Sequence, residues 1–219
     1  MIGAAAWIGL GAAAALAAGD WVAKAKSNTG LEYVCKPATM IALIGAALAL
    51  DPVDDAQRVW FVAALALSLV GDVFLMLPER QFGAADTFTF GLGAFLVGHV
   101  AFVAGFAARG VGSAWVLVAV GGAGAIAVLV APRIVRGARA EDTALGVAVT
   151  AYIAVIVAML LAAWASGVPA AAAGAALFVS SDAMIGWSRF VEKFRGHELA
   201  IIVTYHAAQA LLVVSLATT

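Results

Sequence analysis

Two aspartates of this 219-residue chain lie inside long apolar stretches. Asp72 stands within the run 59–77, and Asp182 follows two serines within the run 168–187. A carboxylate inside a bilayer costs at least a few kcal/mol unless it is paired, protonated or facing water, and it therefore indicates a functional site. We expect Asp72 and Asp182 to face one polar cavity, which we interpret as an active site with general acid–base chemistry.

Four further polar side chains lie at depths that allow them to share this cavity. Lys36 is about a turn and a half inside its apolar stretch, and Tyr205 is about two turns inside the last one. Gln209 follows Tyr205 by four residues, so both lie on one helix face. His99 is near the middle of the fourth stretch. These groups can therefore line one pocket that opens toward the cytoplasmic leaflet.

Each of these residues also has a purely structural interpretation. Asp72 and Lys36 are compatible with a buried ion pair between helices. Asp182 and its two neighbouring serines are compatible with a hydrogen-bonded contact between helices, and His99 with a packing histidine.

The spacing of the candidate ligands does not indicate a metal site. Zinc sites typically contain closely spaced pairs such as His-x-x-x-His, and the chain offers none among these residues. There is no Gly-x-Ser-x-Gly motif, and Cys35 has no local partner for a nucleophilic triad. The sequence predicts neither a metal nor another cofactor.

The elements that must position these residues are membrane helices. The chain is 65% hydrophobic and 11% charged, whereas about a quarter of the residues of a soluble domain are charged. Its net charge of −1 gives no indication of nucleic acid binding. We predict an all-α, polytopic bundle that forms a single domain over residues 1–219. Its eight spans are expected at 2–19, 31–50, 56–77, 87–108, 112–131, 143–165, 168–187 and 198–217.

The distribution of basic residues predicts the orientation. Of the twelve Lys and Arg residues, all but Arg58 and Arg109 lie in or beside the odd-numbered loops. Because cytoplasmic loops are enriched in Lys and Arg, both termini are expected outside the cytoplasm, in a protein of the cell membrane.

The two halves of the chain also resemble each other. Asp72 and Asp182 are 110 residues apart, and His99 and His206 are 107 apart. Four spans per half would give a parallel repeat with both carboxylates at one depth. Chance spacing in an apolar chain is the alternative.

Five short motifs occur in the order and on the spans expected of the YhhN family of membrane lysoplasmalogenases, which the chain resembles over nearly its whole length. These motifs are Cys35-Lys36-Pro37-Ala38-Thr39, Ser68-Leu69-Val70-Gly71-Asp72, Phe95-Leu96-Val97-Gly98-His99, Ser181-Asp182 and Thr204-Tyr205-His206-Ala207-Ala208-Gln209. The chain departs from the pattern at Phe102, where a tyrosine is expected, and at His206, where an aromatic residue is usual.

The resemblance implies an enzyme that hydrolyses the vinyl ether bond of lysoplasmalogens to a fatty aldehyde and a glycerophospho-alcohol. Its partners would be the lysophospholipid substrate and the bilayer. Vinyl ether cleavage needs a proton donor, a base for water and negative charge near an oxocarbenium ion, which two buried carboxylates can supply. By the motif matches, the catalytic residues would be Asp72, Asp182 and His99, and the substrate-binding residues would be Lys36, Tyr205 and Gln209. Lys36 would bind the lipid phosphate or hold a carboxylate ionised, and we favour the phosphate. The main alternative is a proton-coupled transporter or carrier of a small amphiphile. A third is a structural or lipid-binding membrane protein without turnover.

Overall fold

The computed structural model describes residues 2–78, 80–82, 85–110 and 112–218. Within these residues, eight helical segments are long and apolar enough to cross a membrane, which confirms the predicted all-α bundle. Met1, Glu79, Gly83, Ala84, Val111 and Thr219 lie outside the described part of the chain, so the expected loop 78–81 is described without Glu79.

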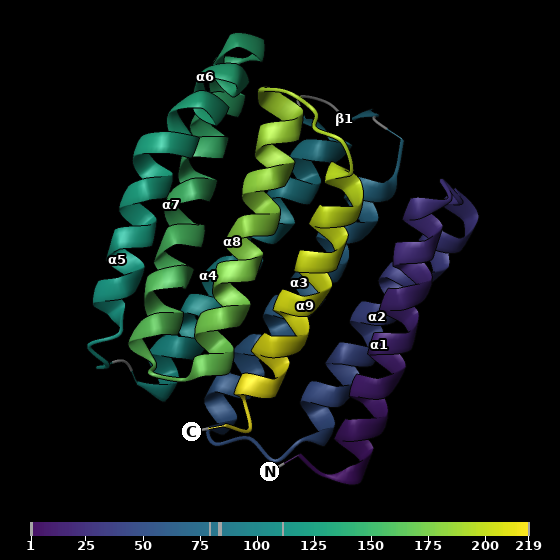
Figure 1. The fold of residues 1–219 in the computed structure, drawn as a ribbon, viewed down its shortest axis with the longest axis vertical. Helices are drawn as coiled ribbons and strands as arrows, with labels where there is room; N and C mark the ends of the chain where they lie inside the picture. The colour runs from purple at the N-terminus through teal and green to yellow at the C-terminus, as the bar shows by residue number, and fades with distance from the viewer. Residues whose placement is uncertain (1, 79, 83–84, 111, 219) are drawn as a thin grey trace.

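The helices follow one another in an up-and-down arrangement (Figure 1). The first four spans are α1 (Ala4–Ala25), α2 (Thr29–Ala49), α3 (Asp55–Met76) and α4 (Thr87–Arg109). A short antiparallel hairpin of β1 (Gln81–Phe82) and β2 (Ala85–Asp86) joins α3 to α4. The fifth span is continuous through α5 (Val116–Ala125), the π-helical turn η1 (Ile126–Val130) and α6 (Ala131–Glu141). The last three are α7 (Thr143–Ala165), α8 (Pro169–Phe190) and α9 (His197–Ser215).

Polar residues in the connections fix where several helices begin. The side chains of Asn28, Asp54, Asp86 and Asp142 each accept a hydrogen bond from the backbone N–H three residues later, at 2.6 to 3.1 Å. Such caps satisfy backbone donors that the first helical turn leaves without an intrahelical partner. The same polar residues that interrupt the hydropathy pattern therefore start α2, α3, α4 and α7.

Close packing of α3 against α4 depends on glycines. A Cβ at Gly98 would lie 3.3 Å from the Ala64 carbonyl oxygen, and one at Gly105 would lie 2.7 Å from the Phe61 ring. Small residues allow membrane helices to approach closely where apolar burial gives no driving force. This contact places Asp72 of α3 beside the helix that carries His99.

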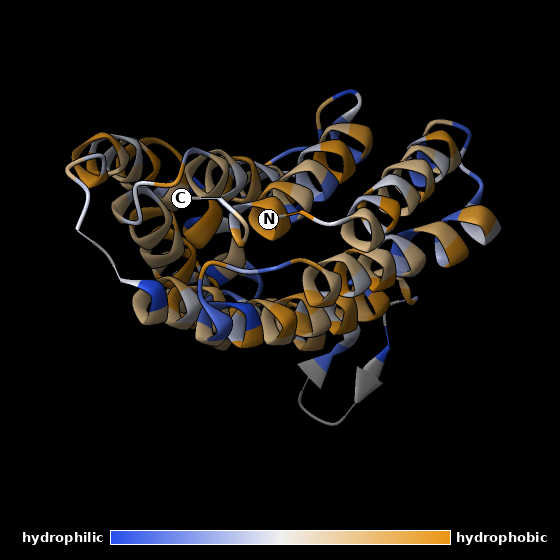
Figure 2. Cartoon of the chain, turned by 90° about the horizontal axis from the view of Figure 1, so that it is seen from below, coloured by the Kyte–Doolittle hydropathy of each residue, from blue (hydrophilic) through white to orange (hydrophobic). Residues whose placement is uncertain are grey.

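The outer surface of the bundle is apolar, as a bilayer requires. Ile8, Leu117 and Val128 are 72 to 73% exposed on α1, α5 and η1. Hydrophobic colouring follows the helices and hydrophilic stretches gather in the connections (Figure 2). A continuous apolar exterior of this kind marks a surface that lipid covers.

Two expected boundaries are wrong. The first span does not end at residue 19, because α1 continues through Asp20 and Trp21 to Ala25. The fifth span does not end at residue 131, because the helix runs on through Pro132 to Glu141. Pro132 takes the second position of α6, directly after the π-helical turn, and a proline lacking its N–H is tolerated in a first turn.

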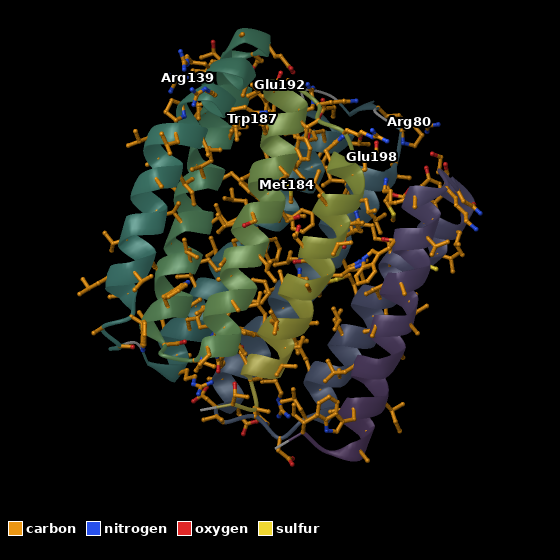
Figure 3. All side chains as sticks on the ribbon, viewed as in Figure 1. Arg80, Arg139, Met184, Trp187, Glu192 and Glu198 are labelled. Carbon is orange, nitrogen blue, oxygen red and sulfur yellow. The ribbon has the colours of Figure 1, made fainter. Side chains whose placement is uncertain are left out.

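The odd-numbered connections gather at one end of the bundle. The turns α1–α2, α3–α4, α6–α7 and α8–α9 lie at one end, where Arg80, Arg139, Glu192 and Glu198 project (Figure 3). Both termini are drawn at the other end (Figure 1). Which end faces the cytoplasm stays a prediction, as does the parallel repeat.

Candidate active site

Asp72 lies near the end of α3 and is bound by side chains from two other helices. Its side chain is 2% exposed, and the Lys36 ammonium of α2 is 3.0 Å from Oδ1. The Tyr205 hydroxyl of α9 donates a hydrogen bond of 2.6 Å to Oδ2 and also lies 3.4 Å from the Met40 sulfur. An ammonium and a hydroxyl directed at one buried carboxylate favour its ionised form.

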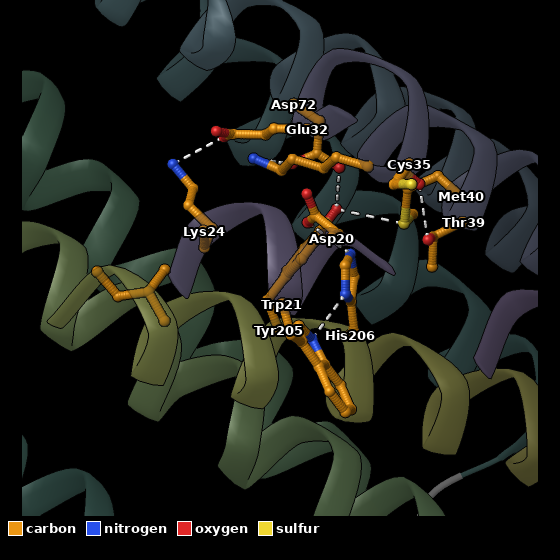
Figure 4. A network of polar contacts seen from close by, with 12 residues as sticks. Asp20, Trp21, Lys24, Glu32, Cys35, Thr39, Met40, Asp72, Tyr205 and His206 are labelled. Atoms are coloured by element: carbon orange, nitrogen blue, oxygen red, sulfur yellow. Dashed lines mark hydrogen bonds and ion pairs between the residues drawn. The ribbon is translucent and has the colours of Figure 1, made fainter. Parts of the chain in front are cut away.

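The Glu32 carboxylate does not neutralise Lys36 in this arrangement. It forms an ion pair of 2.7 Å with Lys24 of α1 (Figure 4). Lys24 also lies 3.8 Å from Glu198 of α9. Lys36 therefore keeps its closest contact with Asp72, one helical turn further into the bundle than the Lys24–Glu32 pair.

Asp182 of α8 has a different set of neighbours. The Tyr152 hydroxyl of α7 donates a hydrogen bond to its Oδ2, and His99 Nε2 of α4 is 3.7 Å from the same atom. His99 Nδ1 is 2.6 Å from the Phe95 carbonyl, which can only accept, so Nδ1 carries a proton. Nε2 is then the ring atom that faces Asp182, and a second proton can lie on either Nε2 or the carboxylate and attract the other group. The geometry suits a carboxyl group that holds and transfers a proton.

Two aromatic rings, those of Phe95 and Phe178, lie between the residues that contact Asp72 and those that contact Asp182. Phe178 packs edge-on against both His99 and Tyr205, with ring centroids 4.6 and 5.6 Å away. Phe95 packs in the same way against Tyr205 at 5.9 Å. Asp72 and Asp182 are nevertheless close enough to interact electrostatically. Phe178 therefore contacts one partner of each aspartate, so the Asp72 and Asp182 groups lie on either side of this ring.

Two cavities adjoin this site, and we call them the apolar cavity and the basic cavity. The apolar cavity, of about 70 Å³, is bounded by α3, α4, η1, α6, α7 and α8, and Asp182 and Tyr152 are its polar members. The basic cavity, of about 510 Å³, is lined by the charged residues Lys24, Lys36, Arg189, Lys193 and Glu198 together with His197. Leu75, Phe88 and Ile185 line both cavities.

The structure brings most of the predicted site residues together. Lys36 and Tyr205 contact Asp72, and His99 lies against Asp182. Gln209 is fully buried one turn beyond Tyr205, and neither of its side-chain polar atoms has a hydrogen-bond partner among the described residues. Ser181 bonds the Ile201 carbonyl at 3.0 Å, so the expected serine contact between helices forms without Asp182.

Sequence reasoning missed Tyr152. It was overlooked because tyrosines in membrane proteins commonly anchor the interfaces. The available signal was its position ten residues into the apolar helix α7, too deep for an interfacial anchor. Among the residues that the structure describes, no three His, Cys, Asp or Glu side chains are grouped so that they could hold a metal.

Comparison with known proteins identifies the family to which the chain belongs. The family model of the YhhN family matches residues 31–216. The chain is 34% identical over 185 residues to a lysoplasmalogenase of Mycobacterium bovis and, with the same figures, to one of Mycobacterium tuberculosis. These matches cover 80% of this chain and 66% of each relative, so the chain spans slightly less than two thirds of their length. No solved structure matches it. The resemblance seen in the motifs is confirmed, and the chain belongs to the YhhN family.

Proposed function

We propose that this protein is a membrane hydrolase that cleaves the vinyl ether bond of lysoplasmalogens. The observation that carries the proposal is the pair of adjoining cavities, each of which has one aspartate in its wall or in contact with a residue of its wall. Asp182 lines the apolar cavity, and Lys36, which holds Asp72, lines the basic one. The names of the two mycobacterial relatives support the same activity.

The two cavities suit the two ends of a lysophospholipid. The phosphate would lie in the basic cavity, where lysines and Arg189 supply positive charge. The start of the alkyl chain would enter the apolar cavity, whose volume of about 70 Å³ holds only a few carbons. The rest of the chain would pass α6 and η1 into the bilayer. The vinyl ether, which joins headgroup and chain, then falls near the residues shared by both cavities.

In the proposed reaction, Asp182 protonates the β-carbon of the vinyl ether, which gives an oxocarbenium ion. Asp72 takes a proton from water as the water oxygen bonds to this cation, and a hemiacetal forms. The hemiacetal collapses as its hydroxyl proton passes to the departing oxygen, which releases the fatty aldehyde and the glycerophospho-alcohol. Proton return from Asp72 to Asp182 completes the cycle, so that one water is consumed and no net proton.

The neighbouring residues divide between these two roles. Lys36 and Tyr205 hold Asp72 ionised, which suits a base and also places negative charge near the cation. His99 and Tyr152 orient Asp182, and His99 supplies a second position for its proton. Gln209, buried behind Tyr205, offers an amide to the substrate or to Tyr205. The protein would act within the cell membrane, with both termini away from the cytoplasm.

The test is turnover by the purified protein in detergent. A lysoplasmalogen and the corresponding ester lysophospholipid are supplied side by side, and the release of fatty aldehyde from the first and of fatty acid from the second is measured. Aldehyde release from the vinyl ether without fatty acid release from the ester supports the proposal. Because transport needs a sealed compartment, a transporter or carrier would produce no aldehyde under these conditions, and that result would overturn it. Asp182→Asn, purified in parallel, controls for a contaminating hydrolase.

A further inference from the structure

A third buried carboxylate lies beside the Asp72 group, on α1. The Asp20 side chain is fully buried, and neither carboxylate oxygen has a hydrogen-bond partner among the described residues. Buried polar atoms are almost always hydrogen-bonded, so an acid in this state calls for a physical explanation. Asp20 was expected in the loop after the first span, where a carboxylate is solvated and indicates no function.

His206 and Trp21 hold a defined arrangement around Asp20 (Figure 4). The Trp21 indole N–H donates a hydrogen bond of 3.2 Å to His206 Nδ1. Since Nδ1 accepts, the proton of the neutral imidazole is on Nε2. Nε2 lies 3.9 Å from Asp20 Oδ2 and has no hydrogen-bond partner among the described residues. Trp21 therefore selects the tautomer that turns an N–H toward the Asp20 carboxylate.

The charged neighbours of Asp20 make it part of the Asp72 environment. Lys36 contacts Asp72 at 3.0 Å, and its positive charge also acts on Asp20. The negative charge of Asp72 acts on Asp20 in the opposite sense. The Cys35 sulfur packs against Gly19, the residue before Asp20. The titratable groups around Asp20 are thus Lys24 on its own helix, Glu32, Cys35 and Lys36 on α2, Asp72 on α3 and His206 on α9.

We propose that Asp20 is a positioning residue of the active site, which shares the Lys36 ammonium with Asp72 and thereby sets the pH range in which Asp72 works. This inference rests on the proposed function for its catalytic consequence. One ammonium beside two carboxylates cannot fully neutralise both. When Asp20 is ionised, its charge opposes ionisation of Asp72 and attracts Lys36 toward α1. When Asp20 is protonated, the Lys36 ammonium neutralises Asp72 alone. His206 supports the ionised form of Asp20 through its Nε2–H.

The charge coupling can be measured without substrate. Infrared difference spectra of the full chain in vesicles are recorded against pH, and the Asp72 carboxyl band is identified by its loss in Asp72→Asn. In Asp20→Asn, removal of one negative charge makes ionisation of Asp72 easier, so its titration moves to lower pH by about half a unit to one unit. Asp51→Asn, at the opposite end of the bundle, leaves the band in place. An unmoved band, or a shift to higher pH, overturns the inference.

Kinetics separate this inference from the proposed function. Asp20 lines neither cavity, so Asp20→Asn should leave KM unchanged while the pH–rate profile moves to lower pH with the infrared band. If the band moves but the wild-type protein cleaves no vinyl ether, the proposed function fails and the charge coupling stands. If wild type cleaves and the band does not move, the inference alone fails.

A second variant keeps the test decisive if Asp20→Asn does not insert. His206→Phe removes the N–H that faces Asp20 and retains an aromatic ring beside Trp21 and Tyr205. Because Asp20 then loses support for its charge, the Asp72 band is expected to move in the same direction by a smaller amount. A band that stays at the wild-type position in His206→Phe would overturn the inference.

Discussion

The Tyr152 hydroxyl donates a hydrogen bond to Asp182, just as the Tyr205 hydroxyl does to Asp72. Each carboxylate of the candidate site thus receives one phenol from a neighbouring helix. The remaining neighbours differ, because Asp72 faces the Lys36 ammonium and Asp182 faces the His99 imidazole. The two aspartates therefore have similar hydrogen bonds but neighbours of different charge, and such a difference lets two carboxylates take different roles in one reaction.

Tyr152→Phe tests the role of this phenol. Hydrogen bonds to charged groups contribute about 1.5–3 kcal/mol, so the loss should lower kcat by about 10- to 100-fold if the bond strengthens in the transition state. Tyr33→Phe is the matched control, because the Tyr33 hydroxyl bonds the Met76 carbonyl at the exposed end of α3. Equal activity in the two variants would show that the Tyr152 hydroxyl has no role in the reaction.

Asp72→Asn and Asp182→Asn test the two carboxylates directly. Asparagine keeps the shape and polarity of the side chain but cannot exchange the proton. Positioned proton transfer contributes about 10²–10⁴-fold, so each variant should lose turnover by a factor in that range while still inserting in the membrane. Aldehyde release is measured together with thermal unfolding in detergent. A near-normal rate in a folded variant would show that its carboxylate is structural.

The residues that both the sequence and the structure bring into the candidate site are those that are costly to place in a bilayer. Asp72, Asp182 and Lys36 each interrupt an apolar stretch, and charge at such depth has few harmless explanations. The eight spans follow from the same contrast between apolar stretches and polar or glycine-rich breaks. Neither inference required knowledge of which helices are neighbours.

The residues that were missed depend on contacts that a linear pattern does not contain. Tyr152 becomes informative only when α7 is known to lie against α8. Asp20 was placed in a loop because Lys24 and Lys26 follow closely, yet α1 continues and buries it against α9. At Pro132 a π-helical turn precedes the proline and the helix goes on. Hydropathy does not report such a local change of hydrogen bonding.

We expect Asp86, in the α3–α4 connection, to make a pH-dependent contribution to the stability of the fold. Its Oδ1 accepts a 2.7 Å hydrogen bond from the Thr89 backbone N–H at the start of α4, and this bond lowers the pKa of the Asp86 carboxyl. A lowered folded-state pKa stabilises the fold above the unfolded-state value of about 3.9, and this stabilisation is lost as the pH falls through the folded-state pKa.

Asp86→Ala should therefore lower the free energy of unfolding by about 1 kcal/mol at neutral pH, with a smaller difference from wild type in acid. Thermal unfolding in detergent at several pH values measures this. Asp86→Asn is the control, because asparagine caps a helix without a titrating group. It should keep most of the stability at neutral pH, and a loss as large as that of alanine would contradict the capping role.

The orientation of the bundle can be tested with reporter fusions. Of the twelve basic residues, ten lie in or beside the odd-numbered connections. This bias predicts that the α6–α7 connection is cytoplasmic and that the C-terminus is not. Fusions after Glu141 and at the C-terminal end should therefore report opposite sides. Fusions that report the same side would contradict the eight-span topology itself.

Lys36→Met distinguishes the two roles that the sequence left open for this lysine. The phosphate-binding role predicts a raised KM, because ground state and transition state both carry the phosphate. The contact of 3.0 Å with Asp72 favours the other role, in which Lys36 holds the carboxylate ionised. Without the ammonium, Asp72 needs a higher pH to lose its proton, so the pH–rate profile should move to higher pH with KM little changed.

Lys193→Met provides the comparison, because Lys193 lines the basic cavity at its exposed rim. A lysine that only attracts the phosphate should raise KM by several-fold when removed and leave the pH–rate profile in place. Measuring kcat and KM across pH for both variants separates the two effects within one cavity. If Lys36→Met raises KM and its profile does not move, Lys36 binds the phosphate, and Asp72 depends on Tyr205 for its ionised form.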